Sequence, residues 1–116
     1  MEDSILISTK NILNIDAGYN AFDLDILTHM NMVFSTLNQI GVGPTIPVMV
    51  EDSTAVWSTL DFPPEQLAMI KTYVFLKVRL LFDPPGTSFV IEAMNKQISE
   101  LEWRLNFFRE VAIDGI

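Results

Sequence analysis

The sequence contains no cysteine and only one histidine. Without cysteine, the chain has no disulfide framework, no thiolate metal site and no cysteine nucleophile. The single histidine, His29, falls at the edge of an apolar stripe, so we interpret it as an ordinary boundary residue and not as part of a catalytic triad or a multi-histidine metal site. The segment Gly41 to Pro44 lacks the Gly-Lys-Ser/Thr ending of a phosphate-binding loop. We therefore expect a protein that is not an enzyme.

Basic residues are scarce, with seven Lys and Arg against fifteen Asp and Glu, and the net charge is −8. Residues 1–70 contain nine acidic residues and a single basic one, Lys10, whereas residues 71–116 contain six of each. This imbalance disfavours a free-standing duplex-binding protein, because contacts to phosphates supply most non-specific affinity for DNA. Two interpretations remain open for the acidic part: a solvated face that maintains solubility, or a surface that must not adhere to polyanions.

A long uninterrupted apolar run is also missing. The most apolar stretch, Leu67 to Phe82, is interrupted by Lys71, Lys77 and Arg79, which oppose membrane insertion. The chain begins Met1-Glu2-Asp3-Ser4, with acids where a signal peptide would carry positive charge. The chain has 116 residues, of which 49% are hydrophobic. We therefore expect one globular domain over residues 1–116, without a membrane segment and in an intracellular setting.

Apolar periodicity predicts an all-α fold, a compact bundle of about four to five helices with a long C-terminal helix and a short extended segment near 42–50. The expected helices cover residues 4–14, 23–40, 63–82 and 88–112, with one or two further turns near 55–60 capped by Asp52 or Ser53. In the helix over 23–40, Asp23 is the expected N-cap, Phe22 and Leu27 form a hydrophobic staple, and Gly41 ends the helix.

The expected helix over residues 63–82 is apolar nearly all round its circumference. A helix of that kind belongs in the middle of a bundle. Its cations Lys71, Lys77 and Arg79 are expected to lay their stems along neighbouring helices and keep their charged ends in water.

The last helix carries two apolar stripes. The first alternates spacings of three and four residues, as in a coiled-coil seam, and is the expected contact with the core; it consists of Ile91, Met94, Ile98, Leu101, Leu105, Phe108 and Ala112. The second stripe, Trp103, Phe107 and Val111, lies about 140° around the helix from the first. Either residues 4–14 or residues 42–50 cover this second stripe, or it contacts another protein. We take Trp103, Phe107, Val111 and Ile113 as candidate protein-interface residues.

Several segments resemble small head-tail connector (adaptor, head completion) proteins of tailed bacteriophages. They are Asp25–Asn31 leading to Leu37–Pro44, then Tyr73–Pro85, and finally Glu102–Asn106. The resemblance covers most of residues 20–109. It implies an all-helical, non-enzymatic protein that needs no cofactor and is present in the host cytoplasm during assembly. It also implies that the protein forms a homo-oligomeric ring below the portal protein at the head-tail junction of the virion. Such a ring extends the channel through which DNA passes without specific binding and provides a platform for a tail or stopper protein. It also implies that the segment Trp103 to Ile116 engages the portal.

Two other functions fit the same residues. The acidic face could mimic DNA and occupy a nucleic-acid-binding partner, which makes the chain a regulatory or inhibitory protein with salt-sensitive binding. The chain could also be a helical assembly factor that acts during head formation and is absent from mature particles.

Overall fold

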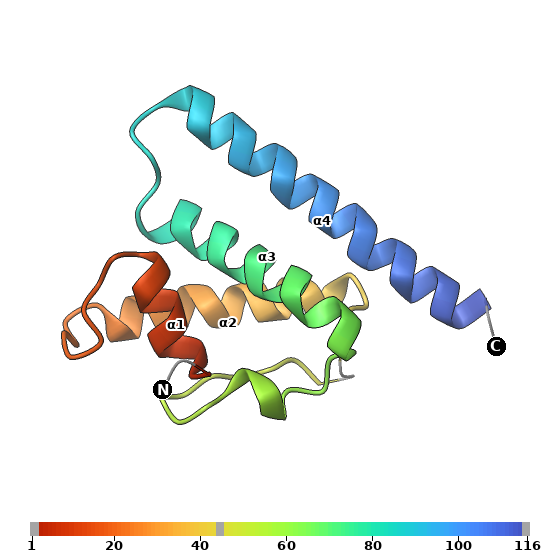
Figure 1. Cartoon of the computed structure of the whole chain (residues 1–116), viewed down its shortest axis with the longest axis horizontal. Coiled ribbons are helices and arrows are strands. Elements are labelled where there is room, and N and C mark those ends of the chain that lie inside the picture. Colours follow the sequence, from red (N-terminus) through yellow and green to blue (C-terminus); the bar gives the residue numbers. More distant parts are fainter. Residues whose placement is uncertain (1–2, 44–45, 115–116) are drawn as a thin grey trace.

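The computed structural model describes residues 3–43 and 46–114, with side chains described up to Asn106 (Figure 1). Within this range the chain forms the helices α1 (Ile5–Ile12), α2 (Asp23–Gln39), α3 (Pro64–Phe82) and α4 (Ser88–Asp114), and one turn of 3-10 helix, η1 (Trp57–Thr59). The described residues contain no β-strand, only a single bridge between Ser4 and Val56. The all-α prediction and the long C-terminal helix are confirmed.

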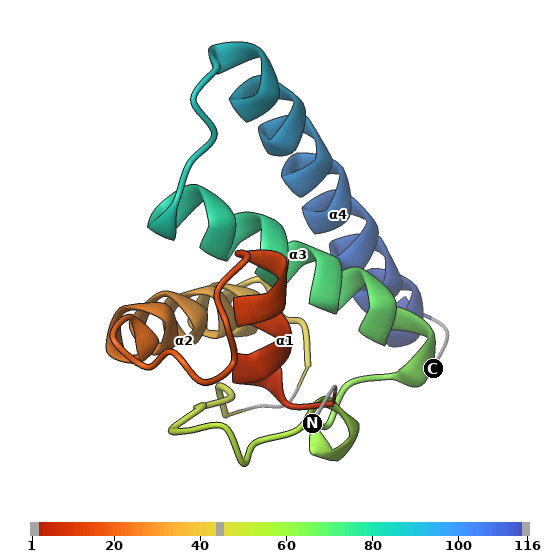
Figure 2. The same cartoon turned by 60° about the vertical axis from the view of Figure 1, so that its left-hand side comes forward.

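Helix α3 lies between α2 and α4 in both views (Figures 1 and 2), and α1 packs against α2. The residues Ile70, Tyr73, Val74 and Val78 of α3 are completely buried, as expected for a helix in the middle of a bundle. Two of its cations lie over aromatic rings: Lys71 Nζ is 5.6 Å from the centroid of the Trp57 ring, and Lys77 Nζ is 5.7 Å from that of Tyr73. The Lys stems therefore follow the neighbouring side chains, as the sequence predicted.

The start of α2 differs from the prediction. The residue at the cap position is Phe22, whose side chain makes no capping hydrogen bond, and Asp23 is the first residue of the helix. The Asp23 carboxylate instead forms an ion pair with Lys10, with 2.8 Å between Nζ and Oδ1. With Phe22 at the cap, the pair Phe22 and Leu27 no longer has the spacing of a hydrophobic staple. The Phe22 ring lies beside Tyr19 and Phe82, at centroid distances of 5.7 and 5.4 Å.

The end of α2 follows the prediction. Gly41 has a φ of +85°, a left-handed conformation that ends the helix, and the Val42 amide donates to the Leu37 carbonyl at 2.9 Å. The next glycine, Gly43, also has a positive φ of +88°, and a Cβ there would lie 2.3 Å from the Phe62 ring. Glycine is therefore required at Gly43 both by the backbone conformation and by the close approach of Phe62.

Residues 47–50 belong to no helix or strand, and Ile46 lies in a bend. The Asn31 side chain fixes this segment through two hydrogen bonds to one residue: its Nδ2 donates to the Val50 carbonyl at 3.0 Å, and its Oδ1 accepts from the Val50 amide at 2.8 Å. The capping predicted for the turns that follow is wrong. Asp52 accepts hydrogen bonds from Thr54, and η1 begins at Trp57 without a side-chain cap.

The predicted seam of α4 is confirmed over the middle of the helix. Ile98 and Leu105 are buried, with 5% and 0% of their surface exposed, and Leu101 is half-buried. Towards the start of α4 the contact loosens, since Ile91 and Met94 are only partly buried. The last two residues assigned to the seam, Phe108 and Ala112, lie outside the described side chains.

Candidate functional site

The side of α4 that faces away from the other helices exposes large aromatic side chains. Phe89 is 80% exposed and Trp103 is 67% exposed. Lys96, which is also exposed, lies seven residues after Phe89 and seven residues before Trp103. Residues seven apart lie on the same side of a helix, so these three define one surface, which we call the outer face of α4.

Of the four predicted interface residues, the structure describes the side chain of Trp103. Its exposure shows that neither α1 nor the described residues of 42–50 cover it. Helix α3 lies between α1 and α4 (Figures 1 and 2). The side chains of Phe107, Val111 and Ile113 lie outside the described part of the chain. The backbone of α4 does continue through them, and this end of the helix extends beyond the other helices (Figure 1).

A polar contact fixes the rotation of α4 about its axis. The Tyr73 hydroxyl on α3 donates to Glu102 Oε2 at 2.6 Å, and Lys77 Nζ lies 4.0 Å from the same oxygen. Together with the burial of Ile98 and Leu105, this contact places the outer face away from α3. The sequence predicted the apolar part of this arrangement but not the hydrogen bond from Tyr73.

The contact between Tyr73 and Glu102 predicts a dependence of stability on pH. Burial, followed by the hydrogen bond to Glu102 and the negative charge of that carboxylate, raises the pKa of the Tyr73 phenol above its usual range. The protonated phenol therefore contributes stability that is fully present below the unfolded pKa of about 10 and is lost as the pH rises above it. We expect the free energy of unfolding of the natural chain to fall between pH 10 and pH 11 for this reason.

We expect Tyr73→Phe to lower the free energy of unfolding at pH 7 by about 1 kcal/mol, because one hydrogen bond is lost. Because phenylalanine does not ionise, the free energy of unfolding of the variant should also fall less steeply above pH 10 than that of the natural chain. Urea denaturation followed by circular dichroism from pH 7 to 11 measures both effects. The control is Tyr19→Phe, since Tyr19 is 52% exposed. Equal alkaline slopes for Tyr73→Phe and the natural chain would contradict the assignment.

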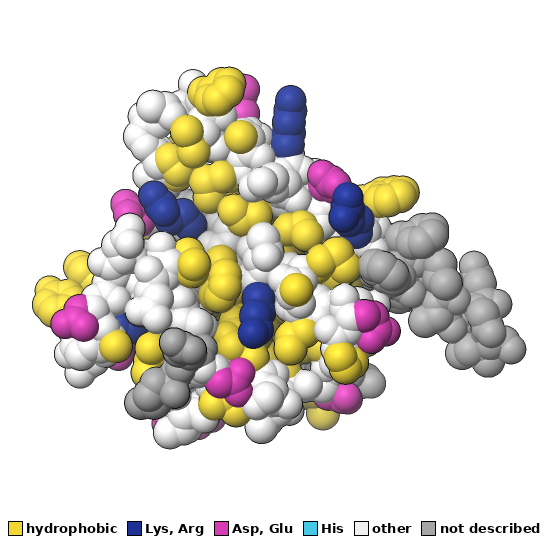
Figure 3. Space-filling model, viewed as in Figure 1, with side chains coloured by type: hydrophobic (Ala, Val, Ile, Leu, Met, Phe, Trp, Pro, Cys, Tyr) yellow, Lys and Arg dark blue, Asp and Glu magenta, His cyan; other side chains and the backbone are white. Residues whose placement is uncertain are grey.

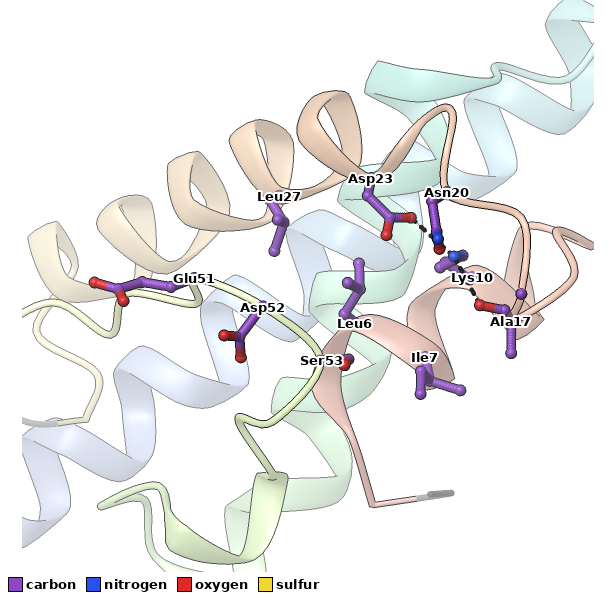
Figure 4. Close-up of a pocket in the computed structure, with 11 residues that line it drawn as sticks. Leu6, Ile7, Lys10, Ala17, Asn20, Asp23, Leu27, Glu51, Asp52 and Ser53 are labelled. Carbon is purple, nitrogen blue, oxygen red and sulfur yellow. Dashed lines mark hydrogen bonds and ion pairs between the residues drawn. The ribbon is translucent and has the colours of Figure 1, made fainter.

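The second feature of the surface is the placement of its charges. Lys10 is buried, with 1% of its side chain exposed. Its ammonium pairs with Asp23 at 2.8 Å and donates to the Ala17 carbonyl at 3.1 Å (Figure 4). Because Lys10 is the only Lys or Arg in residues 1–70, that part of the chain exposes no lysine or arginine at all. It does expose seven carboxylates: Asp3, Asp16, Asp25, Glu51, Asp52, Asp61 and Glu65.

A groove of about 680 Å³ lies over this ion pair, and Glu51, Asp52 and Leu27 also line it (Figure 4). Sequence reasoning counted Lys10 in the charge balance but missed its burial. The available signal was a lone cation in the apolar helix over residues 4–14.

Among the side chains that the structure describes, no three acidic or histidine residues are placed to hold a metal ion. His29 lies partly buried near the Phe82 ring, at a centroid distance of 6.5 Å.

The other basic side chains that the structure describes lie on α3 and α4. A groove of about 180 Å³ runs between α3 and α4 and is lined by Thr72, Gln97, Glu100, Leu101 and Arg104. The face shown in Figure 3 carries a band of hydrophobic side chains with several basic groups around it. Arg104, which is 55% exposed, pairs with Glu100 at 2.7 Å, and Lys71 and Arg79 of α3 are partly exposed. Among the described side chains, the lysines and arginines that reach the surface therefore lie on α3 and α4, whereas residues 3–70 expose only acidic charge.

None of the helices, over the residues described, is both long enough and apolar enough to cross a membrane. The model of the phage connector protein family matches residues 5–112. This match contains α1, α2 and α3 completely and all but the last residues of α4. Comparisons with curated proteins and with solved structures found no match. The family match covers nearly the whole chain and extends the resemblance seen in the sequence to include α1, and on this evidence the chain belongs to the phage connector protein family.

Proposed function

We propose that this protein forms a ring of identical subunits below the portal protein at the head-tail junction of a tailed phage. The ring extends the DNA channel and provides the platform on which a tail or stopper protein assembles. Membership of the connector family supports a structural role in the head-tail region of the virion. The single observation that carries the proposal for this chain is the outer face of α4, where Phe89 and Trp103 are 80% and 67% exposed.

Exposed aromatic side chains on one helix face favour a contact with another protein. Aromatic residues are enriched at the cores of protein interfaces, and two of them, Phe89 and Trp103, are exposed on this face. We propose that Trp103, together with the sequence neighbours Phe107, Val111 and Ile113, contacts the portal or an adjacent subunit. The extension of α4 beyond the other helices supports this placement, because it makes the end of the helix accessible to a neighbour (Figure 1).

The acidic part of the surface suits a channel protein. A wall that carries carboxylates without exposed lysine or arginine repels the phosphates of DNA and does not retain the duplex. Residues 3–70 have this character because their only cation, Lys10, is buried. We propose that DNA passes the ring without specific binding, and that the protein performs no enzymatic reaction and uses no cofactor.

The proposal is tested by Trp103→Asp. We expect the variant to keep its helix content and its free energy of unfolding within about 0.5 kcal/mol, because the indole is exposed. We also expect it to fail to form rings or to bind the portal protein when the two are co-expressed. Size-exclusion chromatography and negative-stain electron microscopy measure assembly, and circular dichroism measures folding. Phe107→Asp is a companion variant with the same expected outcome.

The matched control is Leu24→Asp on α2, which places the same charge on a residue that is 76% exposed. Rings and portal binding should survive this change. If Trp103→Asp instead loses helix content, the indole belongs to the core and the interface proposal fails. If it remains folded and still assembles on the portal like the control, Trp103 has no part in assembly.

A second candidate function is favoured by the same acidic surface. A chain that exposes seven carboxylates and no lysine or arginine over residues 3–70 has the charge pattern of a DNA mimic that occupies a nucleic-acid-binding protein. Pull-down from infected cells separates the candidates: portal or tail proteins support the connector, and a host nuclease or polymerase supports the mimic. Absence of the protein from mature particles would instead support a transient assembly factor.

A further inference from the structure

An open groove lies where the start of α2, the end of α3 and the loop between α1 and α2 meet, at one end of the molecule (Figures 1 and 2). Its volume is about 570 Å³. The loop contributes Leu13 and Ile15, and the other side chains that line the groove are aromatic or acidic. Neither the outer face of α4 nor the ion pair of Lys10 with Asp23 belongs to this groove, so it is a separate feature of the surface.

Three aromatic rings line the groove and lie against one another. The ring centroid of Phe82, at the end of α3, is 5.4 Å from that of Phe22 and 6.5 Å from that of His29. Phe22 is 41% exposed and Phe82 is partly exposed, so a ligand in the groove can reach both phenyl rings. The face of a phenyl ring carries partial negative charge and attracts cations. The aromatic part of the groove therefore favours a cation with a flat, weakly hydrated surface.

Two carboxylates line the same groove. Asp25 lies in the first turn of α2, Asp83 directly follows α3, and both side chains are exposed. Within the described part of the chain, neither carboxylate takes part in a hydrogen bond or an ion pair. Arg79, the cation closest to Asp83 in the sequence, does not line the groove, and its Nε donates to the Asp83 backbone carbonyl at 3.0 Å. The groove therefore holds two negative charges that have no ion-pair partner among the described side chains.

We propose that this groove binds an arginine side chain that a neighbouring protein of the head-tail junction presents. A guanidinium group is planar, so it can stack on an aromatic ring while its N–H groups donate to carboxylates, which the compact ammonium of lysine does less well. Phe22 and Phe82 supply the rings, and Asp25 and Asp83 supply the acceptors. The nature of the neighbour rests on the proposed function, whereas the binding of an arginine side chain rests on the groove alone.

Binding is measured on the full chain by two-dimensional amide NMR at pH 7, with N-acetylarginine amide as the probe. The control ligand is N-acetylcitrulline amide, which has nearly the same shape and no charge. We expect the arginine probe to shift the amide signals of Phe22, Asp25 and Phe82. We also expect it to bind about tenfold more tightly than the citrulline probe, the combined effect of a cation–π contact and two exposed ion pairs. Equal binding of the two probes, or no shifts at these residues, would overturn the inference.

Two double variants test the carboxylates. Asp25→Asn with Asp83→Asn should lower the affinity for the arginine probe about fivefold, because both exposed ion pairs are lost. Both side chains are exposed, so the circular dichroism spectrum should stay that of the natural chain. The matched control, Asp61→Asn with Glu65→Gln, removes two exposed carboxylates near the start of α3, the end of that helix that lies away from the groove. Equal losses for the two double variants would show that the probe responds to net charge and not to the groove.

Co-expression with the portal and with the tail or stopper protein connects the groove to assembly. We expect Asp25→Asn with Asp83→Asn to bind one of these neighbours less well than the control double variant does. Equal binding of both neighbours would overturn the docking role of the groove. If the natural chain does not bind the arginine probe but Trp103→Asp still abolishes assembly, this inference fails and the proposed function stands. If the natural chain binds the probe at the groove but forms no ring on the portal, the proposed function fails and the arginine site stands.

Discussion

Replacing Trp57 with alanine is expected to lower the free energy of unfolding by about 3–5 kcal/mol. The indole is 1% exposed and contacts three helices. Its Nε1 donates to Ser8 Oγ of α1 at 2.9 Å, and its ring centroid lies 6.2 Å from that of Phe34 on α2 and 5.9 Å from that of Phe75 on α3. Truncation leaves a large cavity and removes the indole donor to Ser8 Oγ, so both packing and a hydrogen bond are lost.

The chain offers a matched control for this change, because its only other tryptophan, Trp103, is 67% exposed. Trp103→Ala should change the free energy of unfolding by less than about 0.5 kcal/mol. Urea denaturation followed by circular dichroism measures both variants. A loss of 3–5 kcal/mol is a large share of the stability of an ordinary domain, so partial unfolding of Trp57→Ala at 37 °C is also expected. Similar losses for the two variants would mean that the described burial of the two indoles is incorrect.

The second large effect is expected from Asp23→Asn, which leaves the Lys10 ammonium buried with the Ala17 carbonyl as its remaining partner. Breaking a buried ion pair by removing one member costs about 3–5 kcal/mol. Removal of the other member, Lys10→Met, should cost less, because the Asp23 side chain is 27% exposed and water reaches part of it, although its Oδ1 is buried. The double variant should recover much of the loss, since neither charge remains.

Asp25→Asn is the control for this series. Asp25 also lies in the first turn of α2 but is exposed, so its replacement removes the same favourable interaction with the helix dipole without uncovering a buried charge. The denaturation midpoint at pH 7 is measured for each variant, and the largest fall is expected for Asp23→Asn. If Asp23→Asn costs no more than Asp25→Asn, the pair with Lys10 contributes nothing to the fold.

The helices could be predicted from the sequence because their apolar spacing, prolines and terminal glycines are local signals. Pro64 near the start of α3 and Gly41 after α2 are examples. The role of Asp23 could not be predicted in this way. An aspartate before an apolar run is a good N-cap, but a buried ammonium thirteen positions earlier competes for it, and that competition depends on how α1 packs against α2.

The outer face of α4 was only partly predictable. The second stripe was visible from the spacing of Trp103, Phe107 and Val111, and the exposure of Trp103 agrees with it. Phe89 was missed, although it lies two heptads before Trp103 on the same helix face. The groove between α3 and α4 had no sequence signal, because it depends on the angle at which the two helices meet.

Cryo-electron microscopy of the head-tail junction, on phage particles that carry a labelled copy of this chain, tests the central claim most directly. The account predicts a ring of helical subunits directly below the portal, with α4 of each subunit in contact with a neighbouring protein through the side that carries Trp103. Particles that lack the labelled chain, or that hold it with this side of α4 facing only solvent, would contradict the account.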